Sequence, residues 1–239
     1  MTTATYLPTF TSVNTHFAAP ALVIATVIVA ISCTRSPEPS KPAVTATPAS
    51  APRSARADSL RILADRSRIE GDSAAPVWII DVSDFQCPYC AEWQRNTHEA
   101  LRAEFVRTGK AKLAFVNFPL EQHRHAIPAA RAAMCAGVQG RFWPVHDAIF
   151  ETQTRWADAT DATPIFESIA RTAGVRLADW KECVASGVMD PLIQADRDRA
   201  TAAGVRSTPT FIIGRQIVSG AAPIEEFRRL INLASVPQP

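Results

Sequence analysis

The chain has 239 residues, of which 47% are apolar and 20% charged, with 18 prolines and five cysteines. This composition excludes a fully disordered chain, a collagen-like fibre and a multi-span membrane protein, and five cysteines are too few for a small scaffold held by disulfides. Because five is an odd number, at least one cysteine has a role other than pairing within the chain.

The formal net charge of +2 is unevenly distributed along the chain. Residues 1–57 contain four basic residues and one acidic residue, which gives +3, and the remaining 21 basic and 22 acidic residues give −1. A nearly neutral body with a short basic tail lacks the basic patch that nucleic-acid binding requires. We therefore expect no nucleic-acid partner.

The first segment, residues 1–33, is predicted to direct export. The run Ala18–Ser32 is almost wholly apolar but shorter than the ~20 residues of a membrane-spanning helix, so it suits a secretory signal better. Small residues precede Cys33, and this pattern resembles a bacterial lipoprotein signal, in which Cys33 would carry lipid. Ala30 stands where leucine is typical and no basic residue precedes the run, so an uncleaved anchor and ordinary cleavage remain alternatives. All three place the body outside the cytoplasm.

Residues 34–57 contain five prolines, no aromatic residue and no apolar periodicity. Such a segment cannot bury enough surface to fold, and we expect an extended linker that separates the body from a membrane surface. One folded domain is then predicted over residues 58–239.

Strand and helix patterns alternate in this domain. The branched apolar run Val77–Val82 predicts a buried strand, Pro88–Arg107 a helix, and Lys112–Asn117 a second strand. The later elements are helices over 126–138, 142–151, 164–173, 177–185 and 190–203, strands over 210–213 and 216–218, and a final helix over 223–233. This order predicts an α/β domain with a helical insertion at about 120–205.

The motif Cys87-Pro88-Tyr89-Cys90 lies where the first strand meets the first helix. Free N–H groups and the helix dipole at a helix start stabilise a thiolate at Cys87, which we expect to be exposed, while Cys90 points inward to resolve a mixed disulfide. Pro88 suits the first helical position. A structural zinc site needs four ligands and no second such motif exists, so redox chemistry is the favoured interpretation. A merely structural local disulfide is the remaining alternative.

Two further residues support redox chemistry by their position. Asp81 lies in the apolar strand, where a buried carboxyl could take a proton from Cys90; the alternative is a polar residue at an exposed strand edge. Pro209 precedes the third strand, and a cis Thr208–Pro209 bond would present the Thr208 main chain to an extended peptide.

These motifs together resemble the DsbA family of extracytoplasmic thiol–disulfide oxidoreductases. The 118 residues between Cys90 and Pro209 exceed the spacing of thioredoxin or glutaredoxin and match a thioredoxin fold with an inserted helical domain. The segments Asp84–Cys90 and Gln139–Trp143, followed by His146-Asp147, are similar to the branch with Gram-positive and mycobacterial members. The resemblance extends over residues 71–233.

The resemblance implies a role for each cysteine of the body. Cys87 is the nucleophile and Cys90 its partner, with Asp81 as the buried acid and Thr208-Pro209 as the cis-proline substrate loop. Cys135 and Cys183 would form a second, structural disulfide, which an oxidising compartment permits, and two separate buried thiols are the alternative. The resemblance further implies exported cysteine-containing polypeptides as substrates and a quinone-linked membrane partner of the DsbB or vitamin-K-epoxide-reductase type.

The histidines and aromatic residues are assigned structural roles. Loop polarity and helix capping account for His123, His125 and His146, and His98 is expected at the surface, so no metal site is predicted. Packing is expected of the large aromatic residues, which are Trp93, Phe142, Trp143, Trp156 and Trp180.

The favoured function is a dithiol oxidase in the periplasm or cell envelope that passes the Cys87–Cys90 disulfide to exported proteins and needs no cofactor. A reductase or isomerase would use the same residues, because the direction of exchange depends on how well the fold stabilises the thiolate. A non-catalytic surface lipoprotein that retains the fold is the third alternative. An isomerase usually dimerises through an added domain, and the short lead-in before the fold favours the oxidase.

Overall fold

The computed structural model describes residues 51–235. The apolar segment 18–32, the lipidation candidate Cys33 and most of the expected linker therefore lie outside the described residues. Helix α1 (Ala51–Ser67) begins inside that linker, so the expectation of an extended chain up to residue 57 is wrong at its end. Alanine and arginine favour helix, and α1 is held by burial of Ala64 against Gly137. Between residues 51 and 235 no helix is long and apolar enough to cross a membrane.

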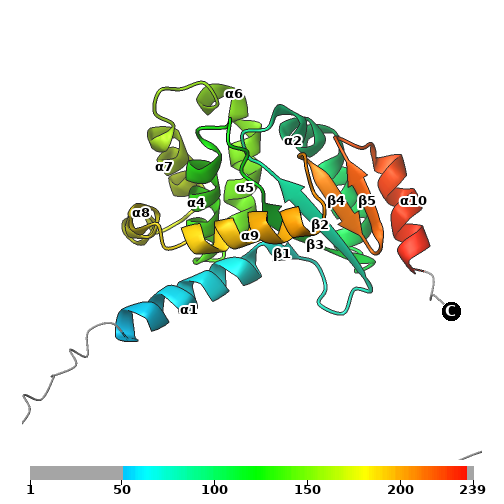
Figure 1. The fold of residues 1–239 in the computed structure, drawn as a ribbon, viewed down its shortest axis with the longest axis horizontal. Coiled ribbons are helices and arrows are strands. Elements are labelled where there is room, and N and C mark those ends of the chain that lie inside the picture. Colours follow the sequence, from blue (N-terminus) through cyan, green and yellow to red (C-terminus); the bar gives the residue numbers. More distant parts are fainter. Residues whose placement is uncertain (1–50, 236–239) are drawn as a thin grey trace, which may run out of the picture. The chain divides into compact units, whose positions relative to one another are not determined.

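The centre of the domain is a five-stranded sheet in the order β1-β3-β2-β4-β5. The strands are β1 (Ile69–Glu70), β2 (Val77–Ser83), β3 (Ala111–Asn117), β4 (Thr210–Ile213) and β5 (Gln216–Ser219). Strand β2 runs parallel to β3 and antiparallel to β4, so it occupies the middle of the sheet (Figure 1). This topology confirms the predicted α/β class.

The helix after β2 carries the cysteine motif and contains two π-helical turns. Its parts are α2 (Pro88–Trp93), η1 (Gln94–His98), α3 (Glu99–Leu101) and η2 (Arg102–Val106), which together match the predicted helix over 88–107. The helix packs with α10 (Ile224–Ser235) on the face of the sheet that carries Val77 and Ile79. Because side chains alternate along a strand, Asp81 faces the same side.

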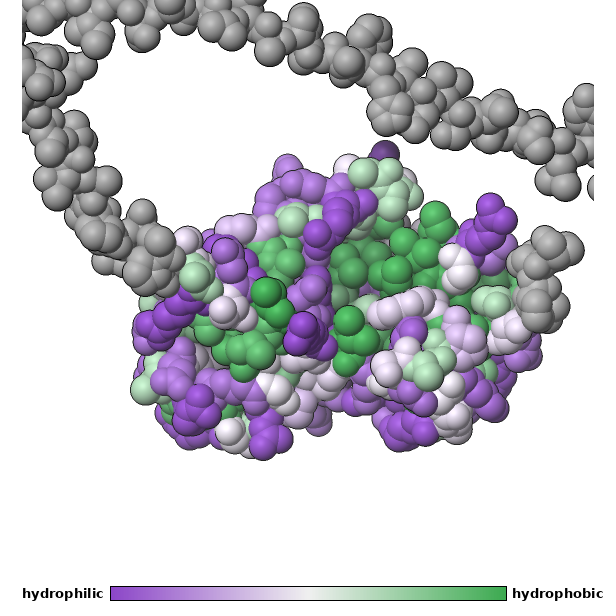
Figure 2. Space-filling model, turned by 90° about the horizontal axis from the view of Figure 1, so that it is seen from below, coloured by the Kyte–Doolittle hydropathy of each residue, from purple (hydrophilic) through white to green (hydrophobic). Residues whose placement is uncertain are grey.

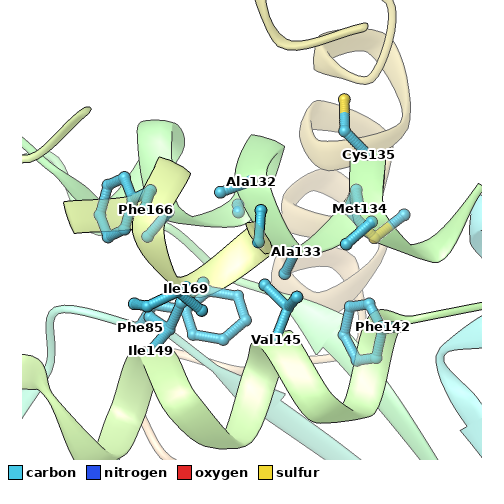
Figure 3. Packing of buried hydrophobic residues seen from close by; sticks show 14 of the residues in the cluster. Phe85, Ala132, Ala133, Met134, Cys135, Phe142, Val145, Ile149, Phe166 and Ile169 are labelled. Carbon is cyan, nitrogen blue, oxygen red and sulfur yellow. The ribbon is translucent and has the colours of Figure 1, made fainter. Parts of the chain in front are cut away.

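The helical insertion consists of α4 (Ala126–Gly137), α5 (Phe142–Glu151), α6 (Gln153–Trp156), α7 (Thr163–Thr172), α8 (Leu177–Ser186) and α9 (Asp190–Ala202). Figure 3 shows Phe142, Val145 and Ile149 of α5 directed towards the alanines of α4. Cys135 of α4 and Cys183 of α8 are joined by a disulfide with an S–S length of 2.01 Å. The expected packing role of the aromatic residues is confirmed, since four are buried and Trp143 is half-buried.

The opposite face of the sheet is covered by α9 only in part. Val82 packs beneath Ala200 of α9, and both line a largely apolar cavity of about 260 Å³ together with the half-buried Ile80 and Ile212. Figure 2 shows apolar side chains gathered on the face seen from below, between hydrophilic ones. The helix that carries the cysteine motif packs on the other face of the sheet, so the cavity is separate from the motif.

Candidate active site

Cys87 lies at the junction between β2 and α2. It is the N-cap residue of α2, with extended backbone angles (φ −69°, ψ 124°), and Pro88 is the first helical residue. The N–H of Ala91 donates to the Cys87 carbonyl at 3.2 Å. The side chain of Tyr89 is exposed, whereas Cys90 is buried one turn along the helix.

Cys87 itself is only 4% exposed, so the expectation of an exposed thiol is wrong. The reason is the loop before β4, which lies against the motif. The Thr208–Pro209 peptide bond in this loop is cis, and the Thr208 carbonyl lies 3.4 Å from the Cys87 Sγ, which donates to it when the thiol is protonated. The loop thus places a main-chain carbonyl beside the sulfur. Both Cys87 and Cys90 are free thiols in this structure.

The two thiols have opposite acidities. Hydrogen bonding from the Cys90 thiol lowers the pKa of Cys87 to about 6, with help from main-chain N–H groups of the first helical turn and against the effect of burial. Burial raises the pKa of Cys90 well above its ordinary value, and the neighbouring Cys87 charge acts in the same direction. At neutral pH, Cys87 is therefore a thiolate and Cys90 a thiol.

Asp81 is buried beneath this pair, in the central strand. Burial raises the pKa of its carboxyl to about 7, although Ser83 donates a hydrogen bond to the carboxylate. The negative charge of Asp81 contributes to the raised pKa of Cys90, which shows that the two groups interact. The alternative of an exposed edge position is wrong, because β2 is not an edge strand.

A second buried carboxylate, Asp84, shapes the turn that leads into the motif. Its carboxylate accepts hydrogen bonds from the Gln86 N–H at 2.7 Å, the Leu120 N–H at 2.8 Å and the His123 ring at 2.7 Å. Burial raises the pKa of Asp84 despite these bonds. His123 therefore supports the active-site turn rather than only adding polarity to a loop.

Two glutamines that the sequence analysis did not single out also hold this turn. The Gln86 side chain donates to the Ala157 carbonyl at 2.8 Å and accepts from the His125 N–H at 2.6 Å. Gln153 of α6 donates to the carbonyls of Phe85 and Cys87 at 2.8 and 2.9 Å. No sequence signal marks Gln153, because its partners lie 66 and 68 residues away.

The expected surface position of His98 and the expected loop or capping role of His146 are both wrong. His98 lies in the η1 π-turn and is 2% exposed, and His146 lies within α5 and is fully buried. Asp147 accepts hydrogen bonds from His146 at 2.8 Å and from Gln94 at 3.1 Å. Burial lowers the pKa of both histidines, to about 3 for His98, so both rings are neutral. They join the motif helix to α5, and across the described part of the chain no three His, Cys, Asp or Glu side chains are arranged to hold a metal.

Comparison with known proteins gives two groups of sequence relatives. The antiporter "Na(+)/H(+) antiporter NhaA 1" of Salinispora arenicola is 29% identical over 171 residues, which cover 71% of this chain but 25% of that protein. The chain thus spans about a quarter of the length of such relatives. The "Probable disulfide bond formation protein D" of Bacillus anthracis is 24% identical over 152 residues, covering 62% of this chain and 70% of that protein.

Solved structures show the same fold. Oxidised BdbD of Bacillus subtilis superposes with a TM-score of 0.64 at 20% identity and covers 70% of this chain and 91% of its own. The family model described as Thioredoxin matches residues 64–233, which include both motif cysteines, the cis-proline loop and the helical insertion. The chain therefore belongs to the thioredoxin family.

Proposed function

We propose that this protein is an extracytoplasmic thiol–disulfide oxidoreductase that acts as a dithiol oxidase through Cys87 and Cys90. The observation that carries the proposal is the lowered pKa of Cys87, about 6, beside a Cys90 thiol whose pKa is raised. A stable thiolate favours the reduced form of the pair, and a pair that prefers its reduced form passes its disulfide readily to other thiols. Similarity to a protein named for disulfide bond formation supports the same chemistry.

The reaction begins with the oxidised pair. A substrate thiolate attacks the Cys87 sulfur, the Cys87–Cys90 bond breaks, and Cys90 leaves with the electron pair. A second substrate thiolate then attacks the substrate sulfur of this mixed disulfide and releases Cys87 as a thiolate. The substrate gains one disulfide and loses two electrons, which remain on the two enzyme cysteines until an external acceptor removes them.

Asp81 is proposed to supply the proton that Cys90 needs on leaving. A thiolate at Cys90 is costly because burial raises the pKa of that thiol, and Asp81, with a pKa of about 7, still carries a proton at neutral pH in much of the population. The same carboxylate accepts the proton back when the pair is reoxidised.

The Thr208-Pro209 loop is proposed to hold the substrate. The Thr208 carbonyl lies 3.4 Å from the Cys87 sulfur and can pair with the main chain of an extended peptide. A peptide bound there would present its cysteine to the sulfur of Cys87, next to the exposed side chain of Tyr89.

The cellular setting belongs to the same proposal. Export, a lipid on Cys33 and reoxidation by a quinone-linked membrane protein of the DsbB or vitamin-K-epoxide-reductase type would place the enzyme where exported chains acquire disulfides. Mass spectrometry of the mature protein tests the lipid directly, because an unmodified Cys33 in the isolated protein rules it out.

The test of the reaction is oxidation of a reduced two-cysteine peptide by stoichiometric oxidised protein. We expect the wild-type protein to form one peptide disulfide per enzyme molecule. Cys87→Ser and Cys90→Ser should form none, because neither variant can form the starting disulfide. Failure of the wild-type protein to oxidise the peptide, with rapid reduction of an oxidised peptide by the reduced enzyme, would instead show a reductase.

A further inference from the structure

A glutamine of the helical insertion contacts the main chain of the cysteine motif. Gln153 is the first residue of α6 and is 7% exposed. Its amide nitrogen donates to the Phe85 carbonyl at 2.8 Å and to the Cys87 carbonyl at 2.9 Å. An amide NH₂ group has two hydrogens, so both are used on the two carbonyls that flank Gln86.

The carbonyl of Cys87 matters because it belongs to the reacting residue. It also accepts the first helical hydrogen bond, from the Ala91 N–H at 3.2 Å. A carbonyl oxygen carries partial negative charge, and in a buried site an uncompensated one disfavours a thiolate on the same residue. The Gln153 NH₂ group compensates this charge and fixes the extended backbone of Cys87.

Gln86 links the turn to the same part of the insertion. Its side chain donates to the Ala157 carbonyl just after α6 and accepts from the His125 N–H just before α4. Cys87 and Cys90 moreover belong to the apolar cluster formed mainly by α4, α5 and α7. The insertion thus forms hydrogen bonds with both side-chain and main-chain groups of the turn before α2.

We propose that Gln153 is a positioning residue that keeps the Cys87 main chain in the geometry that favours the thiolate, so that the helical insertion helps to set the redox preference of the motif. The inference rests on the proposed redox function of Cys87 and Cys90. It assigns to the insertion a part in the chemistry in addition to its packing.

Two substitutions of similar side-chain length test the role. Gln153→Met removes both donors without adding charge, and Gln153→Glu replaces the donating nitrogen with an oxygen that can only accept when ionised. The matched control is Gln139→Met. Gln139 lies in the same insertion and also bonds main-chain groups, accepting from the Arg176 N–H at 2.9 Å and donating to its carbonyl at 3.3 Å, but it does not contact the motif turn.

The measurements are the pKa of Cys87, from thiolate absorbance against pH, and the equilibrium constant with glutathione, both on folded protein purified by gel filtration. We expect Gln153→Met to raise the pKa by about one unit and to make the pair roughly fivefold less oxidising at pH 7, with a larger effect in Gln153→Glu. Gln139→Met should change neither quantity. If Gln153→Glu does not fold, Gln153→Met decides.

A lowered free energy of unfolding with an unchanged pKa and an unchanged glutathione equilibrium would overturn the proposal, because Gln153 would then only support the fold. Failure of the proposed function is a separate result. A wild-type protein that does not oxidise the peptide would refute the oxidase, while the pKa and the glutathione equilibrium of the variants would still report on Gln153.

Discussion

The wild-type protein should lose stability as the pH rises from about 4 to 7, and replacing Asp81 with asparagine should remove most of this loss. The folded protein holds the Asp81 proton up to about pH 7, whereas the unfolded chain releases it near its ordinary pKa of 3.8. Between these values the folded state binds more protons than the unfolded state, so the contribution of Asp81 to stability falls as the pH rises from about 4 to 7. Above pH 7 the loss is complete and constant.

The raised pKa sets the size of the effect. The full separation from 3.8 to about 7 corresponds to roughly 4 kcal/mol, and the part that develops between pH 5 and pH 7.5 is about 2.5 kcal/mol. The asparagine amide has its own burial cost of about 1–3 kcal/mol, but that cost does not change with pH. The quantity to measure is therefore the free energy of unfolding of Asp81→Asn relative to wild type, and how this difference changes with pH.

This change is measured by urea unfolding of the oxidised wild-type and variant proteins, followed by tryptophan fluorescence. Cys87 and Cys90 do not titrate in the oxidised proteins because they are joined by a disulfide. We expect the free energy of unfolding of Asp81→Asn, relative to wild type, to increase by about 2.5 kcal/mol from pH 5 to pH 7.5. Asp198→Asn, which removes an exposed carboxylate from α9, is the control. If the Asp81→Asn difference is equal at both pH values, the folded protein does not hold the Asp81 proton up to about pH 7, and Asp81 cannot serve as the proton donor to Cys90.

Three further changes have expected outcomes. Cys90→Ala removes the thiol that donates to Cys87 and should raise the pKa of Cys87 from about 6 towards 9, as followed by thiolate absorbance; an unchanged pKa would assign the acidity to the helix start alone. Replacing both Cys135 and Cys183 with alanine opens a loop of 48 residues and should lower the free energy of unfolding by about 4 kcal/mol in urea, while leaving the pKa of Cys87 in place. Asp147→Ala leaves the buried His146 donor unpaired and should cost about 2 kcal/mol of stability at pH 7, and a loss below about 0.5 kcal/mol would show that water replaces the carboxylate.

Much of the fold was predictable because it depends on short-range patterns. The branched apolar run at 77–82 and the glycines after several helices indicate where elements begin and end, and the observed bounds of the expected elements differ from the expected ones by no more than two residues. The motif cysteines follow from the same reasoning, since a strand that ends just before a proline at the first helical position places Cys87 at a helix start.

The parts that could not be predicted depend on contacts distant in sequence. Thr208, 121 residues away, lies against the buried Cys87, and Gln153 reaches the motif from α6. The polarity of His98 and His146 indicates a surface or loop position, but the packing of α5 against the motif helix buries both rings. Helix α1 could not be predicted because its first residues belong to the proline-rich segment 34–57, which indicates an extended chain. The helix depends instead on burial of Ala64 against the insertion.

The proposed oxidase function is tested most directly by the reduction potential of the Cys87–Cys90 pair, measured by equilibration with defined ratios of reduced and oxidised glutathione at pH 7. A thiolate stabilised at Cys87 beside a buried Cys90 thiol predicts an oxidising pair, with a potential more positive than about −200 mV. A potential near that of thioredoxin, about −270 mV, would contradict the assignment as a dithiol oxidase.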